Sequence, residues 1–180
     1  MKKFEEVNKY VKEECFKKGK SEIYNHLFLV SNYAGILGGS LIVGEIQMLK
    51  IAGLLHDIGY IYYGRKNHEI TGAEKAEQLL RNFYKKKEKR NLIRDCILHH
   101  RSSCLRRTIE EKIIADSDNI AYIDNFCNFY DFLEGINQKE RVSLSILEII
   151  KKKHRHLELE ESRNLIIGRY EKVMEVIQKC

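Results

Sequence analysis

Apolar residues recur along most of the chain at intervals of three and four positions, the spacing of one face of an α-helix. The first predicted helix ends at Gly19, and its apolar face carries Phe4, Val7, Val11 and Cys15. No stretch of useful length alternates apolar and polar residues as a half-buried strand would. The pattern therefore predicts one all-α domain over residues 1–180, a bundle of roughly seven to nine helices.

Local signals place the remaining helix boundaries. A second helix is expected to begin at Ser21 and to be broken by glycines, namely Gly35, Gly38 and Gly39. A third is expected from about Gly44 to Ile58, ending at Gly59. Later helices have polar residues at their expected starts, which are Thr71 or Asn67, Asn91, Thr108 with Glu111 as a capping box, and Asn137 with Glu140.

Composition supports a soluble helical protein. Hydrophobic residues make up 43% and charged residues 32% of the chain, and proline is absent. The net charge of +6 suits partners that carry phosphate, although the basic runs at 85–90 and 151–155 have the character of solvated helix ends. Because the basic residues are dispersed and form no recognisable nucleic-acid motif, nucleic acid is not an expected partner.

Cysteine usage and hydropathy indicate the compartment. The five cysteines form no CxxC pair, which argues against a disulfide framework and favours a reducing environment. The charged N-terminal residues lack the apolar segment of a signal peptide. The long uncharged stretch Leu27–Gly44 contains four glycines and is interpreted as buried helix and turn, not as a membrane span. We therefore expect a cytoplasmic protein with no membrane association.

Candidate chemistry centres on the dipeptide His56-Asp57, which lies inside the apolar segment IAGLLHDIGY. An imidazole and a carboxylate are costly to bury unless they pair with each other or bind a metal ion. His26 and His100 also share helix faces with apolar residues. Asp116 and Asp118 interrupt the apolar pattern IIADSDNIAYI, but they lie about 200° apart around a helix, so both cannot face one ion.

Histidines and carboxylates from four separate helices match the usual construction of a metal site inside a helical bundle. Mixed nitrogen and oxygen ligands favour a divalent transition metal such as Mn, Fe, Co, Ni or Zn. The alternative for His56-Asp57 is a buried polar pair without metal.

The order of His26, His56-Asp57 and a later aspartate resembles the HD-domain superfamily of metal-dependent phosphohydrolases, over residues of about 20–125. Two further segments are similar to small members of the superfamily, HEITGAE with His68 and ILHHRSS with His100. The resemblance implies a helical bundle of the HD-domain type. The five parts of this pattern are His26, His56-Asp57, His68, His100 and the late aspartate. Together they look like the subset of the superfamily that binds two metals, which includes nucleotide-cleaving hydrolases of the diadenosine tetraphosphate type.

The resemblance also implies roles for individual residues. The first metal would be held by His26, His56, Asp57 and Asp118. Asp57 would bridge to a second ion bound by His68 and His100, so that one or two ions are expected. Asp118 matches the register of the superfamily's late aspartate, and Asp116 remains the alternative. A metal-bound hydroxide would then be the nucleophile.

Basic residues near these positions are candidate phosphate contacts. Arg101 follows His100, and Arg65 and Lys66 precede His68; the alternative is loop solubility. Tyr60 stands where many members of the superfamily have a basic residue, and it is a candidate for lining the pocket or for ordinary packing. His154 and His156, in a charged segment, are expected to be solvated.

The sequence thus predicts an enzyme that cleaves a phosphate ester or anhydride of a small phosphorylated substrate, with a nucleotide favoured. Its expected catalytic residues are Asp57, His68, His100 and Arg101. The alternative is a metal- or nucleotide-binding sensor without turnover. The C-terminal helices, at about 126–180, would cover the core, close the pocket or pair with a second copy of the chain in a homodimer.

Overall fold

The computed structural model describes residues 2–101, 103–135 and 144–177. Within these ranges the chain forms helices and no strand, which confirms the all-α prediction. The helices are α1 (Lys2–Lys17), α2 (Ser21–Ser40), α3 (Ile46–Leu55), α4 (Ile58–Tyr63), α5 (His68–Leu80), α6 (Lys87–Leu98), α7 (Ile109–Gly135), α8 (Leu144–Arg155) and α9 (Glu160–Ile177).

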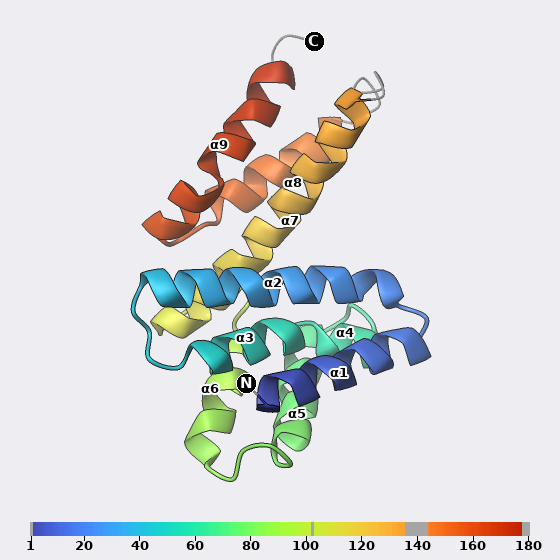
Figure 1. Cartoon of the computed structure of the whole chain (residues 1–180), viewed down its shortest axis with the longest axis vertical. Helices are drawn as coiled ribbons and strands as arrows, with labels where there is room; N and C mark the ends of the chain where they lie inside the picture. The colour runs from blue at the N-terminus through green and yellow to red at the C-terminus, as the bar shows by residue number, and fades with distance from the viewer. Residues whose placement is uncertain (1, 102, 136–143, 178–180) are drawn as a thin grey trace.

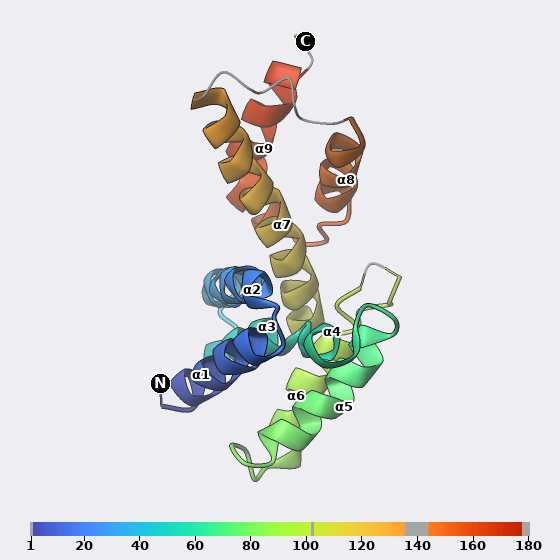
Figure 2. The same ribbon diagram turned by 90° about the vertical axis from the view of Figure 1, so that its right-hand side faces the viewer.

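The first six helices gather into one group, from which the long helix α7 extends to α8 and α9 (Figures 1 and 2). Helix α3 is almost wholly buried because α2, α1, α6 and α7 all pack against it. The apolar face predicted for the first helix is confirmed, since Val7, Val11 and Cys15 are fully buried against this core. Helices α8 and α9 pack along α7.

The glycines of α2 do not break it, contrary to the sequence prediction. The helix continues through Gly35, Gly38 and Gly39 to Ser40. A Cβ atom on Gly38 would lie 2.6 Å from Cδ1 of Leu49, so glycine here allows α3 to approach α2 closely. Gly38 therefore serves the packing of α2 on α3, whereas Gly39 has open space around it.

The third predicted helix is in fact two. Helix α3 ends at Leu55, and α4 begins at Ile58 after a break at His56 and Asp57. Gly59 lies inside α4 and does not end a helix. A Cβ atom there would lie 2.1 Å from the carbonyl oxygen of His68, so its absence lets α5 cross α4 almost in backbone contact.

Other boundaries were predicted with mixed success. Helix α6 begins at Lys87 and not at Asn91. The predicted capping box is confirmed in its first half, because the Glu111 N–H donates to Thr108 Oγ1 at 3.2 Å, whereas the Glu111 carboxylate accepts from the Arg107 N–H at 2.7 Å. The start predicted at Asn137 and Glu140 lies outside the described residues. Among the described helices, none is long and apolar enough to cross a membrane.

Candidate metal centre

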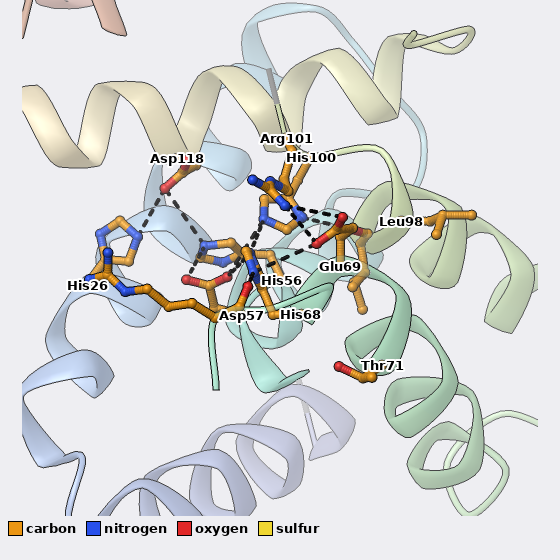
Figure 3. A network of polar contacts seen from close by, with 12 residues as sticks. His26, His56, Asp57, His68, Glu69, Thr71, Leu98, His100, Arg101 and Asp118 are labelled. Atoms are coloured by element: carbon orange, nitrogen blue, oxygen red, sulfur yellow. Dashed lines mark hydrogen bonds and ion pairs between the residues drawn. The ribbon is translucent and has the colours of Figure 1, made fainter. Parts of the chain in front are cut away.

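Six side chains selected from the sequence point toward one another where α3 gives way to α4 (Figure 3). They come from α2, the α3–α4 junction, the first residue of α5, the segment just after α6 and the first half of α7. Their possible ligand atoms form two groups, each within 4.8 Å: His26, His56 and Asp118 in the first group, and Asp57, His68 and His100 in the second group.

The first group is centred on one carboxylate oxygen. Oδ1 of Asp118 lies 3.0 Å from Nε2 of His26 and 3.7 Å from Nε2 of His56. Nε2 of His56 is also 3.7 Å from Oδ2 of Asp57, a member of the second group. The two groups are therefore neighbours, and Asp57 contacts both.

The second group is equally compact. Oδ1 of Asp57 lies 3.0 Å from Nε2 of His68 and 3.6 Å from Nε2 of His100. The two Nε2 atoms of these histidines are 3.3 Å apart. Within this group, one carboxylate and two imidazoles thus converge on a common point.

Backbone carbonyls fix the orientation of three of the rings. Each of these histidines places Nδ1 within hydrogen-bonding distance of the carbonyl oxygen three residues earlier. The bonds are His56 to Gly53 at 2.8 Å, His68 to Arg65 at 2.9 Å and His100 to Ile97 at 2.7 Å. A carbonyl only accepts, so each Nδ1 carries the proton and each Nε2 presents a lone pair to the centre.

These lone pairs provide a test of whether a metal ion fits. Nε2 of His56 is buried and has no hydrogen-bond partner among the residues that the structure describes. In their neutral forms, His68 and His100 direct two Nε2 lone pairs at each other at 3.3 Å, a repulsion that a proton or a bound metal ion between them relieves. Imidazole Nε2 atoms oriented by carbonyls at Nδ1 are typical metal ligands, so this donor set fits divalent transition metals.

The electrostatics favour ionised carboxylates. Burial alone would raise the pKa of Asp57, but the imidazoles of His56 and His68, at 3.7 Å and 3.0 Å from its carboxylate, reverse this effect and hold its pKa below the ordinary value. Burial opposes ionisation of Asp118 as well, yet the Lys153 ammonium and His26 hold the pKa of Asp118 well below its usual range. Both carboxylates are therefore charged and able to bind a cation at neutral pH.

His100 should make the metal-free protein sensitive to acid. Burial, with a smaller contribution from His56, lowers the pKa of His100 from 6.5 to about 4. Between these values the unfolded chain binds more protons than the folded one, so the free energy of unfolding falls as the pH falls. We expect a loss of up to roughly 3 kcal/mol through this window, measured by urea unfolding. The free energy of unfolding of His100→Gln should fall less than that of the wild type over the same pH range. Equal falls in the two proteins would contradict the assignment to His100.

Asp116, the alternative late aspartate, lies apart from the two groups. Its carboxylate accepts hydrogen bonds from the backbone N–H of Glu158 at 3.0 Å and of Leu159 at 2.9 Å. Burial raises the pKa of Asp116, and these bonds oppose the rise only in part. The structure therefore places Asp118, and not Asp116, beside His26 and His56.

A cavity of about 640 Å³ opens over the two groups. Of the three basic residues predicted to contact phosphate, Arg101 and Arg65 line it, whereas Lys66 is not among the described residues of its wall. Arg101 pairs with Glu69 at 3.2 Å, which holds its guanidinium beside His68. Tyr60 also lines the cavity.

Sequence reasoning missed the contribution of α8 to this cavity. Ile149, Lys152, Lys153 and His156 line its wall, and Nζ of Lys153 lies 3.1 Å from Oδ2 of Asp118. The run 151–155 had the character of a solvated helix end. The available signal was the i, i+3, i+4, i+7 spacing of these four residues, which places them on one helix face.

The expectation that His154 is solvated is wrong. Its ring stacks on Tyr170 with centroids 3.9 Å apart, and its Nε2 atom is buried. His156 is half-buried at the edge of the cavity. His154 of α8 thus packs against Tyr170 of α9, whereas His156 belongs to the cavity wall.

Comparison with known families agrees with this geometry. The HD domain family matches residues 23–123, more than half of the chain. The chain belongs to the HD domain family. The HD domain places it in a superfamily of metal-dependent hydrolases, and the matched segment contains all six residues of the two ligand groups.

A solved structure shares the HD domain fold. It is a predicted HD superfamily hydrolase from an uncultured Thermotogales bacterium, with 22% identity and a TM-score of 0.68. The alignment covers 97% of this chain and 89% of that one, so the similarity in fold extends beyond the HD domain to α8 and α9. No curated protein sequence matches the chain.

Proposed function

We propose that this HD domain protein is a phosphohydrolase that uses one or two divalent transition-metal ions to cleave a phosphate ester or anhydride of a small substrate. The observation that carries the proposal is the position of the two ligand groups, which Asp57 links, at the base of a cavity with basic walls. The basic side chains are Arg65, Arg101, Lys152 and Lys153. Their charge complements a phosphoryl group at the point where the ligand atoms converge.

The two ligand groups would hold different ions. His26, His56 and Asp118 would hold one ion, and Asp57, His68 and His100 the other. A bound divalent ion would lower the pKa of a water ligand and withdraw charge from a phosphoryl oxygen.

The chain itself supplies orientation. Asp57 reaches both groups and so sets their spacing, while the backbone carbonyls hold the Nε2 lone pairs inward. Arg101 can offer two N–H donors to a phosphate while Glu69 restrains it.

A nucleotide is the favoured substrate because the same cavity also has apolar and aromatic walls. Tyr60, Tyr122, Ile23 and Ile149 line it beside the basic residues. Aromatic and apolar side chains provide a surface for a nucleobase, and the arginines and lysines a surface for its phosphates.

The proposal is tested by loading the protein with Mn²⁺, Fe²⁺, Ni²⁺ or Zn²⁺ and assaying a panel of nucleotides and other phosphoesters. We expect stoichiometric metal and release of phosphate or a nucleoside monophosphate. A folded protein that binds no metal would overturn the proposal. Nucleotides that raise the melting temperature without any product would instead favour a sensor.

A further inference from the structure

Helix α8 has two faces with different roles. Leu147 and Ile150 are buried and belong to the hydrophobic core that α8 shares with α7. Ile149, Lys152 and Lys153 occupy the other face and line the cavity above the ligand groups. Because α8 lies beyond the 23–123 match, this wall is not part of the matched HD domain.

Lys153 shares a carboxylate with the first ligand group. Its ammonium lies 3.1 Å from Oδ2 of Asp118, while Oδ1 of the same carboxylate faces His26 and His56. The Lys153 ammonium also lies 5.2 Å from the centroid of the Tyr122 ring, which lines the same cavity. The lysine therefore contacts the ligand group from the cavity side.

A cation in this group and the Lys153 ammonium would compete for Asp118. Both are positive and both contact one carboxylate, so each weakens the binding of the other. A phosphoryl group entering the cavity would offer the lysine a second anionic partner, on the same side as Lys152.

We propose that α8 carries an anion-binding subsite in which Lys153 exchanges Asp118 for a phosphoryl oxygen of the ligand once a divalent cation is bound. Lys152, one position earlier, supplies a second positive charge to this subsite. This inference rests on the proposed function, because it assigns the phosphoryl-bearing substrate a partner within the same cavity. It predicts opposite effects of Lys153 on metal binding and on phosphate binding.

The test compares Lys153→Met with Lys151→Met. Lys151 lies on the same helix, pairs with the exposed Glu148 at 2.8 Å and is not among the residues that line the cavity. Calorimetry would measure the affinity for Mn²⁺ alone, and then the affinity of the Mn²⁺-loaded protein for inorganic phosphate. We expect Lys153→Met to bind Mn²⁺ roughly tenfold more tightly and phosphate roughly tenfold more weakly, with no change for Lys151→Met.

Lys153→Arg keeps the charge and should retain phosphate binding within about threefold of wild type. Unchanged or weaker Mn²⁺ binding by Lys153→Met, or phosphate binding equal to that of Lys151→Met, would overturn the inference even if the wild type hydrolyses phosphoesters. Conversely, Lys153→Met could bind Mn²⁺ more tightly and phosphate more weakly while the wild type hydrolyses no phosphoester. That result would uphold the subsite and overturn the proposed hydrolase. A wild type that binds no Mn²⁺ would overturn both.

Discussion

Replacing Asp57 by asparagine should reduce the kcat/KM of phosphoester hydrolysis by about a thousandfold or more, equivalent to ~4 kcal/mol of transition-state stabilisation. Asp57 is the carboxylate in contact with both ligand groups, at 3.0 Å from His68 and 3.7 Å from His56. Asparagine preserves the shape of the side chain but removes its charge and one of its acceptor oxygens. Elemental analysis should show less than the wild-type metal content.

Asp95→Asn provides the matched control, since Asp95 is a partly exposed carboxylate that pairs with Arg94 on α6. It should retain the metal content and the kinetics of the wild type. Melting temperatures of both variants would show whether the fold persists. Wild-type metal content and turnover in Asp57→Asn would remove this carboxylate from the proposed mechanism.

The Gly59→Ala variant should be destabilised by about 3 kcal/mol, the upper part of the range for overpacked sites. The added Cβ atom would meet the carbonyl oxygen of His68 at 2.1 Å and the amide nitrogen of Gly72 at 2.6 Å. Both are backbone atoms and cannot rotate aside, so α5 must move away from α4. His68 would move with α5, and we therefore expect weaker Mn²⁺ binding as well as a lower midpoint of urea unfolding.

Gly39→Ala is the corresponding control, because a Cβ atom at Gly39 has nothing within 4 Å. Gly39 lies within α2, so alanine should stabilise the protein by up to about 1 kcal/mol. A Gly59→Ala protein with the stability and Mn²⁺ affinity of the wild type would contradict the close crossing of α4 and α5.

Gly38 and Gly59 also show how much of the fold can be predicted from sequence patterns. Helical periodicity predicted the buried face of α1 correctly, because each apolar position there packs against the core. The same reasoning treated glycines as helix breakers, whereas Gly38 and Gly59 lie inside helices. A glycine that weakens an isolated helix is retained where two helices nearly touch, and this contact depends on a partner distant in sequence.

The candidate site was predictable where the residue order of a family could be matched. The six residues of the two ligand groups were selected from that order, and their roles as ligands and catalysts stay predictions. Register favoured Asp118 over Asp116, and the backbone bonds of Asp116 explain why a second buried carboxylate stands so near. The position of Lys153 in the cavity was not predicted, because the sequence of a basic run is the same whether the run faces solvent or a cavity.

The hydrogen bonds of Asp116 have a consequence for fragments of this protein. They join the segment just before α9 to Asp116 of α7. Asp116 lies two residues before Asp118, so the α8–α9 hairpin is anchored beside the ligand groups. A fragment truncated after the 23–123 match would lose these donors and uncover the apolar side of α7. We therefore expect a minimal folded fragment of this protein to extend beyond the HD domain match and through α9.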